Sequence, residues 1–206
     1  ADVILRTAEE FGCGLIVTGI ARDETLGRFG LGGSVNRLIR RSKVPILIVK
    51  QRARRPYSDI VVATDFSRSS RHALRAAMAF FPTQRLSLYH AFETPLQGMT
   101  SDEKSYQGHY RQIALGNCAA FLAEEQISDE RRQGIGLVAE HGDPGYLVQR
   151  FARERGVDLI VLGTHGRGGL LDIVIGSTAR NILSSLSCDA LVVREPDARV
   201  EDDIRP

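Results

Sequence analysis

Residues 159–178 read LIVLGTHGRGGLLDIVIGST, and this stretch decides the fold that we expect for the chain. Its four leading apolar residues predict a short buried strand, and a glycine-rich loop follows from Gly163. Gly176 and Ser177 then open a segment with the pattern of a helix, which we expect over residues 177–185. A strand, a glycine-rich loop and a helix in this order are typical of an anion site at the end of a parallel sheet.

The loop and the start of this helix bring together groups that suit an anion. Glycines lack a Cβ atom, so backbone amides can close on a phosphate, and a helix start adds unpaired N–H groups and the positive end of the helix dipole. Ser177 and Thr178 supply hydroxyl donors, and His165 and Arg167 supply further donors. The segment contains no Gly-Lys-Ser/Thr and is therefore not a Walker A loop. A glycine-rich turn without a ligand is the alternative.

The residues before this stretch alternate between strand and helix patterns. We expect strands over residues 60–63, 86–91, 135–140, 159–162 and 190–193, and a polar loop over residues 92–107. Between the strands we expect helices that run from a cap at Ser67 or Ser69 to Phe81, over residues 110–126, from Asp143 and Pro144 onward, and over residues 177–185. This order predicts an α/β fold, a doubly wound, mainly parallel five-stranded sheet flanked by helices, of the Rossmann-like kind. Such sheets bind ligands where the strand order reverses, and there Asp65 would meet the Gly163 loop.

The first fifty residues repeat the end of the chain at one constant spacing, as three matched pairs illustrate: Gly19 with Gly163, Gly32 with Gly176, and Leu47 with Leu191. A gapless match of this length indicates duplicated units. We therefore expect a partial, degenerate copy over residues 1–50 that lacks its front half. A linker over residues 51–56, a complete domain over residues 57–195 and a tail over residues 196–206 would follow.

The spacing of the loop glycines resembles a known signature. Gly163-x2-Gly166-x9-Gly176-Ser177 is similar to the G-2x-G-9x-G-S/T motif of nucleotide-binding universal stress proteins. An Asp at the end of the first strand and a His-containing second strand followed by Pro (His90 to Pro95) agree with this family. The resemblance covers residues 57–195, and the first fifty residues would make the chain a tandem type with an incomplete first domain. It implies an adenine nucleotide alpha-hydrolase-like fold.

The same resemblance implies a role for each matching residue. Asp65 would lie near the ribose and the metal–phosphate region, and Ala91 would meet the adenine through its backbone. The phosphates and ribose would be held by the remaining residues of the motif, Gly163, His165, Gly166, Gly176, Ser177 and Thr178, with Arg167 as an additional phosphate contact. ATP, ADP or AMP would bind with Mg²⁺ or Mn²⁺, possible partners of Asp65. From the residues alone, Asp65 could instead cap the following helix, and His90 is more typical of a packed or hydrogen-bonded strand residue.

The first copy departs from the motif. Arg22 stands at the position of Gly166, and Asp23 and Glu24 place carboxylates that would repel a phosphate. We therefore expect this copy to be structural. The resemblance implies that last strands pair across a domain–domain or homodimer interface, here from Val44 to Val49 and from Ala190 to Val193.

Composition narrows the class of protein. The net charge of +2 gives no reason to expect nucleic acid or a membrane as a partner, and no apolar run approaches the roughly 20 residues of a membrane helix. Three distant cysteines argue against a disulfide framework or a zinc site, and favour a cytoplasmic setting. We expect a nucleotide-binding regulatory protein of stress responses. The alternatives are an interaction scaffold without nucleotide and a slow ATP hydrolase, since the chain shows no obvious catalytic apparatus.

Overall fold

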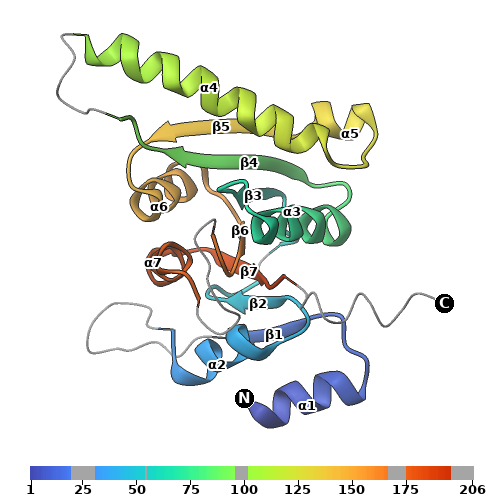
Figure 1. The fold of residues 1–206 in the computed structure, drawn as a ribbon. Helices are drawn as coiled ribbons and strands as arrows, with labels where there is room; N and C mark the ends of the chain where they lie inside the picture. The colour runs from blue at the N-terminus through green and yellow to red at the C-terminus, as the bar shows by residue number, and fades with distance from the viewer. Residues whose placement is uncertain (20–30, 54, 96–101, 167–174, 196–206) are drawn as a thin grey trace.

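The computed structural model describes residues 1–19, 31–53, 55–95, 102–166 and 175–195. These residues form one seven-stranded sheet of strand order β1-β2-β7-β6-β3-β4-β5 (Figure 1). Its strands are β1 (Ile16–Gly19), β2 (Ile46–Val49), β3 (Asp59–Ala63), β4 (Arg85–Phe92), β5 (Gly136–His141), β6 (Leu159–Gly163) and β7 (Asp189–Val193). Neighbouring strands are parallel except β2 and β7, which are antiparallel. The five strands predicted from the sequence are confirmed.

Helices cover both faces of the sheet, as the predicted doubly wound α/β fold requires (Figure 1). They are α1 (Asp2–Glu10), α2 (Gly33–Arg41), α3 (Arg68–Phe80), α4 (Glu103–Ala123), the short α5 (Asp129–Gln133), α6 (Pro144–Arg155) and α7 (Ser177–Ser185). One buried apolar cluster joins the sheet to α2, α6 and α7, and a second joins its other face to α3 and α4. The two clusters make the fold a three-layer sandwich.

Side-chain caps fix where α3 and α6 begin. Ser67, rather than Ser69, is the N-cap of α3, and its hydroxyl accepts the amide of Ser70 at 3.2 Å. Asp143 caps α6 by accepting the amide of Tyr146 at 2.8 Å, with Pro144 as the first helical residue, as predicted. These caps set the ends of α3 and α6 that face the candidate site.

The start of α4 and the presence of α5 differ from the sequence prediction. The expected loop over residues 92–107 is too long, because α4 already begins at Glu103. Asp102 accepts the amide of Ser105 at 3.1 Å, and this cap starts the helix before its apolar residues begin. The short helix α5 was not predicted, and the hydroxyl of Ser128 starts it by accepting the amide of Arg131.

The strands β2 and β7 join the first fifty residues to the rest of the chain. Ile46 pairs with Val192 and Ile48 with Ala190, so the predicted pairing of the last strands occurs within one chain. Each of the two strands has a second neighbour on its other side, β1 for β2 and β6 for β7. Both edges of β2 and both edges of β7 are therefore paired with neighbouring strands of this sheet. Whether residues 51–56 separate two domains stays a prediction.

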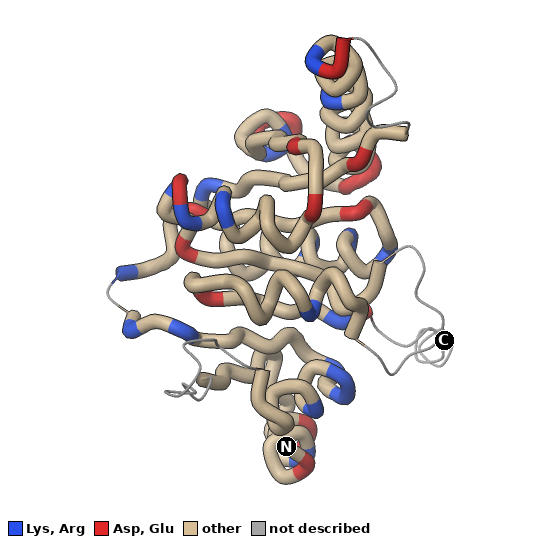
Figure 2. The backbone as a smooth tube through the Cα atoms, turned by 90° about the vertical axis from the view of Figure 1, so that its left-hand side faces the viewer, with Lys and Arg blue, Asp and Glu red and all other residues tan. Residues whose placement is uncertain are grey.

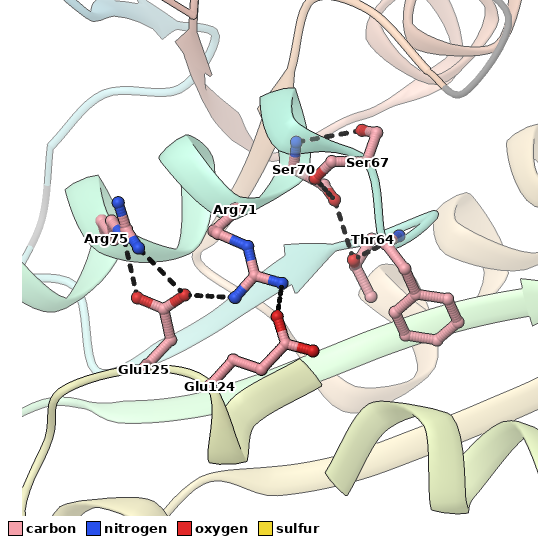
Figure 3. Close-up of polar contacts among 8 residues, drawn as sticks. Thr64, Ser67, Ser70, Arg71, Arg75, Glu124 and Glu125 are labelled. Atoms are coloured by element: carbon pink, nitrogen blue, oxygen red, sulfur yellow. Dashed lines mark hydrogen bonds and ion pairs between the residues drawn. The ribbon is translucent and has the colours of Figure 1, made fainter. Parts of the chain in front are cut away.

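A carboxylate between two arginines ties α3 to the end of α4 (Figure 3). Glu125, which is 5% exposed, accepts from Arg75 Nε at 2.7 Å and from Arg71 Nη1 at 2.6 Å. Arg71 also pairs with Glu124 and stacks its guanidinium 4.4 Å from the ring centre of Phe121. Burial raises the pKa of Glu125, but hydrogen bonds and charges from Arg75 and Arg71 outweigh it and hold this pKa below its ordinary value.

We expect Glu125→Gln to lower the free energy of unfolding by about 2 kcal/mol at pH 7, because a buried partner of two cations is neutralised. A carboxylate whose folded pKa is lowered stabilises above its unfolded pKa and loses that contribution as the pH falls through the folded pKa. The difference between the variant and the parent should therefore shrink below pH 4.5, the ordinary value. Urea unfolding from pH 7 down to this range measures it, with Glu124→Gln, at an exposed partner of Arg71, as the matched control. If the difference in unfolding free energy between the variant and the parent stays constant with pH, the ionised carboxylate of Glu125 is not what stabilises the fold.

Candidate functional site

A cavity of about 630 Å³ lies at the carboxyl ends of β3, β4 and β6, beside the first turns of α6 and α7. The strand order reverses here: the chain runs from β3 outward to β4 and β5, then returns to β6 and β7 on the other side of β3. This reversal leaves a crevice at the ends of β3 and β6, since the segments that leave the two strands turn to opposite faces. The position is the one that the strand–loop–helix pattern predicts.

The structure brings together the predicted site residues that it describes. All of them line this cavity: Asp65, Ala91, Gly163, His165, Gly166, Gly176, Ser177 and Thr178. Arg167, predicted as an additional phosphate contact, lies outside the described residues. Residues almost a hundred positions apart, such as Asp65 and Gly163, therefore share one cavity, while their roles toward a ligand stay predictions.

Asp65 sits in a tight turn between β3 and α3. One carboxylate oxygen, Oδ1, accepts the amide of Ser67 at 3.1 Å. Phe66, between them, has a φ of 64°, which an aromatic residue adopts at a cost that its packing must offset. The centre of its ring lies 4.3 Å from the centre of the His90 ring. The Nδ1 atom of His90 is in turn 2.8 Å from the carbonyl oxygen of Thr64. His90 is thus a packed, hydrogen-bonded residue that supports the turn of Asp65.

Hydroxyl groups lock this turn to the start of α3 (Figure 3). Thr64 Oγ1 donates to Ser70 Oγ at 3.0 Å and accepts the amide of Phe66 at 3.0 Å. Ser70 Oγ in turn donates to the carbonyl of Ser67 at 2.9 Å. Thr64 and Ser70 also line the cavity, so these bonds fix one of its walls before any ligand arrives.

The turn of Asp65 and the loop after β6 contact each other directly. The His165 amide donates to Ser69 Oγ at 3.3 Å, and Ser67 Oγ donates to the His165 carbonyl at 3.4 Å. A Cβ atom on Gly163 would lie 2.7 Å from the Ser69 carbonyl carbon. Gly163 is therefore required by the close approach of α3 to β6, a reason that the sequence motif alone does not reveal.

Gly166 is required by a second close approach. A Cβ atom there would lie 2.6 Å from Oδ2 of Asp65, so any other residue must displace this carboxylate. Among the described residues, a Cβ on Gly176 would by contrast meet only the Thr164 carbonyl oxygen, at an ordinary 3.6 Å. Of the three motif glycines, Gly163 is therefore the one at which neighbouring backbone excludes a side chain, whereas a side chain at Gly166 would push the Asp65 carboxylate aside.

The start of α7 presents an uncapped helix end to the cavity. Gly176 is the N-cap, no side chain of the described residues makes a cap bond to it, and the first turn holds no acidic residue. Ser177 and Thr178 are exposed and line the cavity. The first N–H groups of a helix have no partner within it and lie at the positive end of its dipole. This end of α7 therefore suits a phosphate.

His165 offers a further polar atom. Its Nδ1 lies 2.8 Å from Thr164 Oγ1, while its Nε2 is buried and has no hydrogen-bond partner among the described residues. A buried polar atom without a partner costs stability, and a ligand in the cavity that His165 lines can supply one.

The apolar part of the cavity was not predicted from the sequence. This wall is formed by Ala63, Tyr89, Val148, Leu162, Ile175 and Ile182. The hydroxyl of Tyr89 donates to Glu140 Oε2 at 2.6 Å, and Arg150 donates to the same oxygen. Because its hydroxyl is engaged there, Tyr89 contributes its ring to the cavity wall. The signal for these residues is the ordinary periodicity of a core, which does not distinguish a cavity wall from packed interior.

Among the described residues that line the cavity, Asp65 is the one carboxylate. No group of three or more metal-ligating side chains occurs in the described parts of the chain. Within those same parts, no helix is both long and apolar enough to cross a membrane.

Known proteins agree with this architecture. The sequence profile of the Universal stress protein family matches residues 1–50 and 56–194. Universal stress protein MJ0531 of Methanocaldococcus jannaschii is 28% identical over 144 residues, which are 68% of this chain and 84% of that relative. Protein PA1789 of Pseudomonas aeruginosa PAO1, of unknown function, has a similar structure, with a TM-score of 0.67 at 26% identity over 97% of this chain and 70% of its own.

A universal stress protein of Archaeoglobus fulgidus shares the fold at 20% identity, with a TM-score of 0.63 over 94% of this chain and 66% of its own. The family profile covers nearly the whole chain, including the glycine motif from Gly163 to Ser177. The chain belongs to the universal stress protein family.

Proposed function

We propose that the cavity binds ATP or a related adenine nucleotide, and that the protein serves as a nucleotide-dependent regulator in stress responses. The observation that carries this proposal is that one cavity unites an uncapped helix end, a glycine loop of nucleotide-binding spacing and an apolar wall. Its volume of about 630 Å³ is in the range of small-molecule sites. Three free cysteines, two of them buried, fit the reducing cytoplasm as its location.

The two ends of the cavity would hold different parts of the nucleotide. The base would lie against Val148, Leu162 and Ile182, where apolar contact favours an aromatic ring, with the backbone of Ala91 at its edge. The phosphates would lie at Gly176, Ser177 and Thr178, where amides, hydroxyls and the helix dipole favour negative charge. His165 Nε2 would gain a hydrogen bond from the ribose or phosphate oxygens.

Asp65 fits a Mg²⁺ or Mn²⁺ ion that arrives with the nucleotide. Such ions bind one or two carboxylates together with phosphates and water, so one carboxylate at the cavity suffices. The ion would supply charge neutralisation for the phosphates. We propose binding rather than fast catalysis, because Asp65 already accepts the Ser67 amide and no second carboxylate among the described residues lines the cavity.

We further propose that residues 1–50 are a structural, degenerate copy of the last quarter of the chain. Two reciprocal contacts support this: Lys50 Nζ donates to the carbonyls of Leu183 and Leu186 at the end of α7, and Arg194 Nη1 donates to the carbonyl of Arg40 at the end of α2. Lys50 and Arg194 occupy matching positions of the repeat. The last residue of each copy thus donates to the end of the last helix of the other copy, α7 or α2.

Denaturing the purified protein and identifying the released small molecules by mass spectrometry tests the nucleotide proposal. We expect an adenine nucleotide at about one per chain, or, for protein freed of ligand, calorimetric binding of Mg-ATP with a similar stoichiometry. A protein that releases no nucleotide and gives no heat with added Mg-ATP would instead support a scaffold without a ligand.

A further inference from the structure

A second groove, of about 610 Å³, lies between α2 and α7 and shares none of its described lining residues with the proposed nucleotide cavity. Four arginines of the described residues line it: Arg37, Arg40 and Arg41 from α2, and Arg180 from α7. The two helices lie over neighbouring strands, β2 and β7, on the same face of the sheet. Figure 2 turns this side of the molecule toward the viewer and shows Lys and Arg positions gathered on α2, the helix next to the one that carries the N-terminus.

The positive charge of this groove is largely uncompensated within the described residues. Asp2 pairs with Arg37 at 3.2 Å and with Arg41 at 2.6 Å, so two guanidinium groups share one carboxylate. In the part of the chain that the structure describes, neither Arg40 nor Arg180 forms an ion pair. Like charges around one groove repel each other, and an anion between them would remove that cost.

Helix dipoles explain only part of this arrangement. Arg40 and Arg41 occupy the last turn of α2, where the negative end of the dipole favours a cation. Arg180 occupies the first turn of α7, where the dipole disfavours a cation. Gly33, in the uncapped first turn of α2, also lines the groove, which adds backbone N–H groups to its donors. The groove thus combines hydrogen-bond donors from α2 and α7. The positive charge of Arg180 in it is not explained by the dipole of α7.

We propose that this groove is an anion site for a chain of two or more phosphates, held by Arg40 and Arg180 from opposite sides. The planar guanidinium fork matches phosphate oxygens, and several such forks suit a multiply charged phosphate chain better than a single carboxylate. A volume of about 610 Å³ suits a small molecule. The ligand would join residues 1–50 to α7 of the nucleotide-binding part, a function additional to the proposed nucleotide cavity.

Calorimetry with inorganic tripolyphosphate at low ionic strength tests this site. We expect the parent to bind it, and the double variant Arg40→Gln/Arg180→Gln to bind at least about tenfold more weakly, since two charge-assisted contacts are lost. Arg153→Gln, at an exposed arginine of α6 outside both cavities, is the matched control and should bind as the parent does. All three replaced side chains are exposed, so circular dichroism should show unchanged folding.

Gly166→Arg distinguishes the two cavities, because it alters the nucleotide cavity alone. We expect this variant to keep its affinity for tripolyphosphate. Equal affinity of the parent and the Arg40→Gln/Arg180→Gln protein would overturn the proposal. So would loss of tripolyphosphate binding in Gly166→Arg, which would place the phosphates in the nucleotide cavity.

Discussion

Replacing Gly166 by arginine should lower the affinity for Mg-ATP at least about 100-fold, which corresponds to about 2.7 kcal/mol. The reason lies in the contact between two loops. Any Cβ atom at position 166 would lie 2.6 Å from Asp65 Oδ2, so the carboxylate must leave its position. The new guanidinium would then stand beside Asp65 as an ion-pair partner and compete with the metal ion for it. Calorimetric titration with Mg-ATP measures the loss.

Gly166→Ala isolates the steric part of this effect. We expect an approximately tenfold loss of affinity, because alanine displaces the carboxylate without adding charge. The matched control is Gly116→Ala in α4, where a Cβ atom would meet nothing within 4 Å and where alanine favours the helix. This control should bind nucleotide as the parent does.

A double-mutant cycle then tests whether Asp65 transmits the effect. If Gly166→Ala acts by displacing this carboxylate, it should weaken binding far less when Asp65 is already alanine. A full, additive loss in that background would show that position 166 instead acts on the phosphates directly. The cycle thus separates two physical reasons for one glycine that the motif alone cannot separate.

The succession of strands and helices along the chain, and the meeting of Asp65 with the Gly163 loop, could be predicted because their signals are local. Apolar β-branched runs mark β3 and β6, and the Asp143–Pro144 pair marks the start of α6. Once strands and helices alternate, a parallel doubly wound sheet is expected, and the segments that leave the carboxyl ends of its strands share one edge, where ligands bind at the reversal of strand order. The location of the cavity therefore follows from patterns that each span only a few residues.

Features that depend on packing between distant segments could not be predicted. Nothing near Phe66 in the sequence indicates a positive φ, since the contact that stabilises it comes from His90 on another strand. Val148 and Ile182 have the periodicity of core residues, and only the assembled sheet leaves a cavity beside them. Nothing in the sequence around Lys50, the last residue of the first copy, indicates that its side chain is buried, yet it is 8% exposed and its ammonium donates to the Leu183 carbonyl of α7.

Asp189 is the position at which we expect the largest effect on stability. It is 6% exposed at the start of β7, and its Oδ1 accepts the amides of Lys50 at 2.7 Å and Gln51 at 3.1 Å. Its Oδ2 accepts the hydroxyl of Tyr57 at 2.6 Å. One carboxylate therefore joins the end of the first fifty residues, the start of the following segment and β7.

Asp189→Ala should lower the free energy of unfolding by about 4 kcal/mol, because it leaves buried donors without an acceptor and a buried cation without its nearby anion. Urea unfolding at pH 7 measures the change. Asp189→Asn, which keeps one acceptor oxygen but not the charge, should lose about half as much. Asp129→Ala is the control, since that side chain is 86% exposed and should change stability by less than about 0.5 kcal/mol.

The pKa of Lys50 gives this prediction its sharpest test. Burial lowers that pKa to about 8, although the charge of Asp189 acts in the opposite direction. A lysine whose folded pKa lies below its unfolded value of 10.5 costs stability while it is ionised, and the cost falls as the pH rises between the two values. Without Asp189 the cost at pH 7 is larger, so adding Lys50→Met to Asp189→Ala should restore part of the lost stability. If Lys50→Met instead lowers stability further in that background, the hydrogen bonds to Leu183 and Leu186 outweigh the charge, and the loss in Asp189→Ala comes from its unpaired amides.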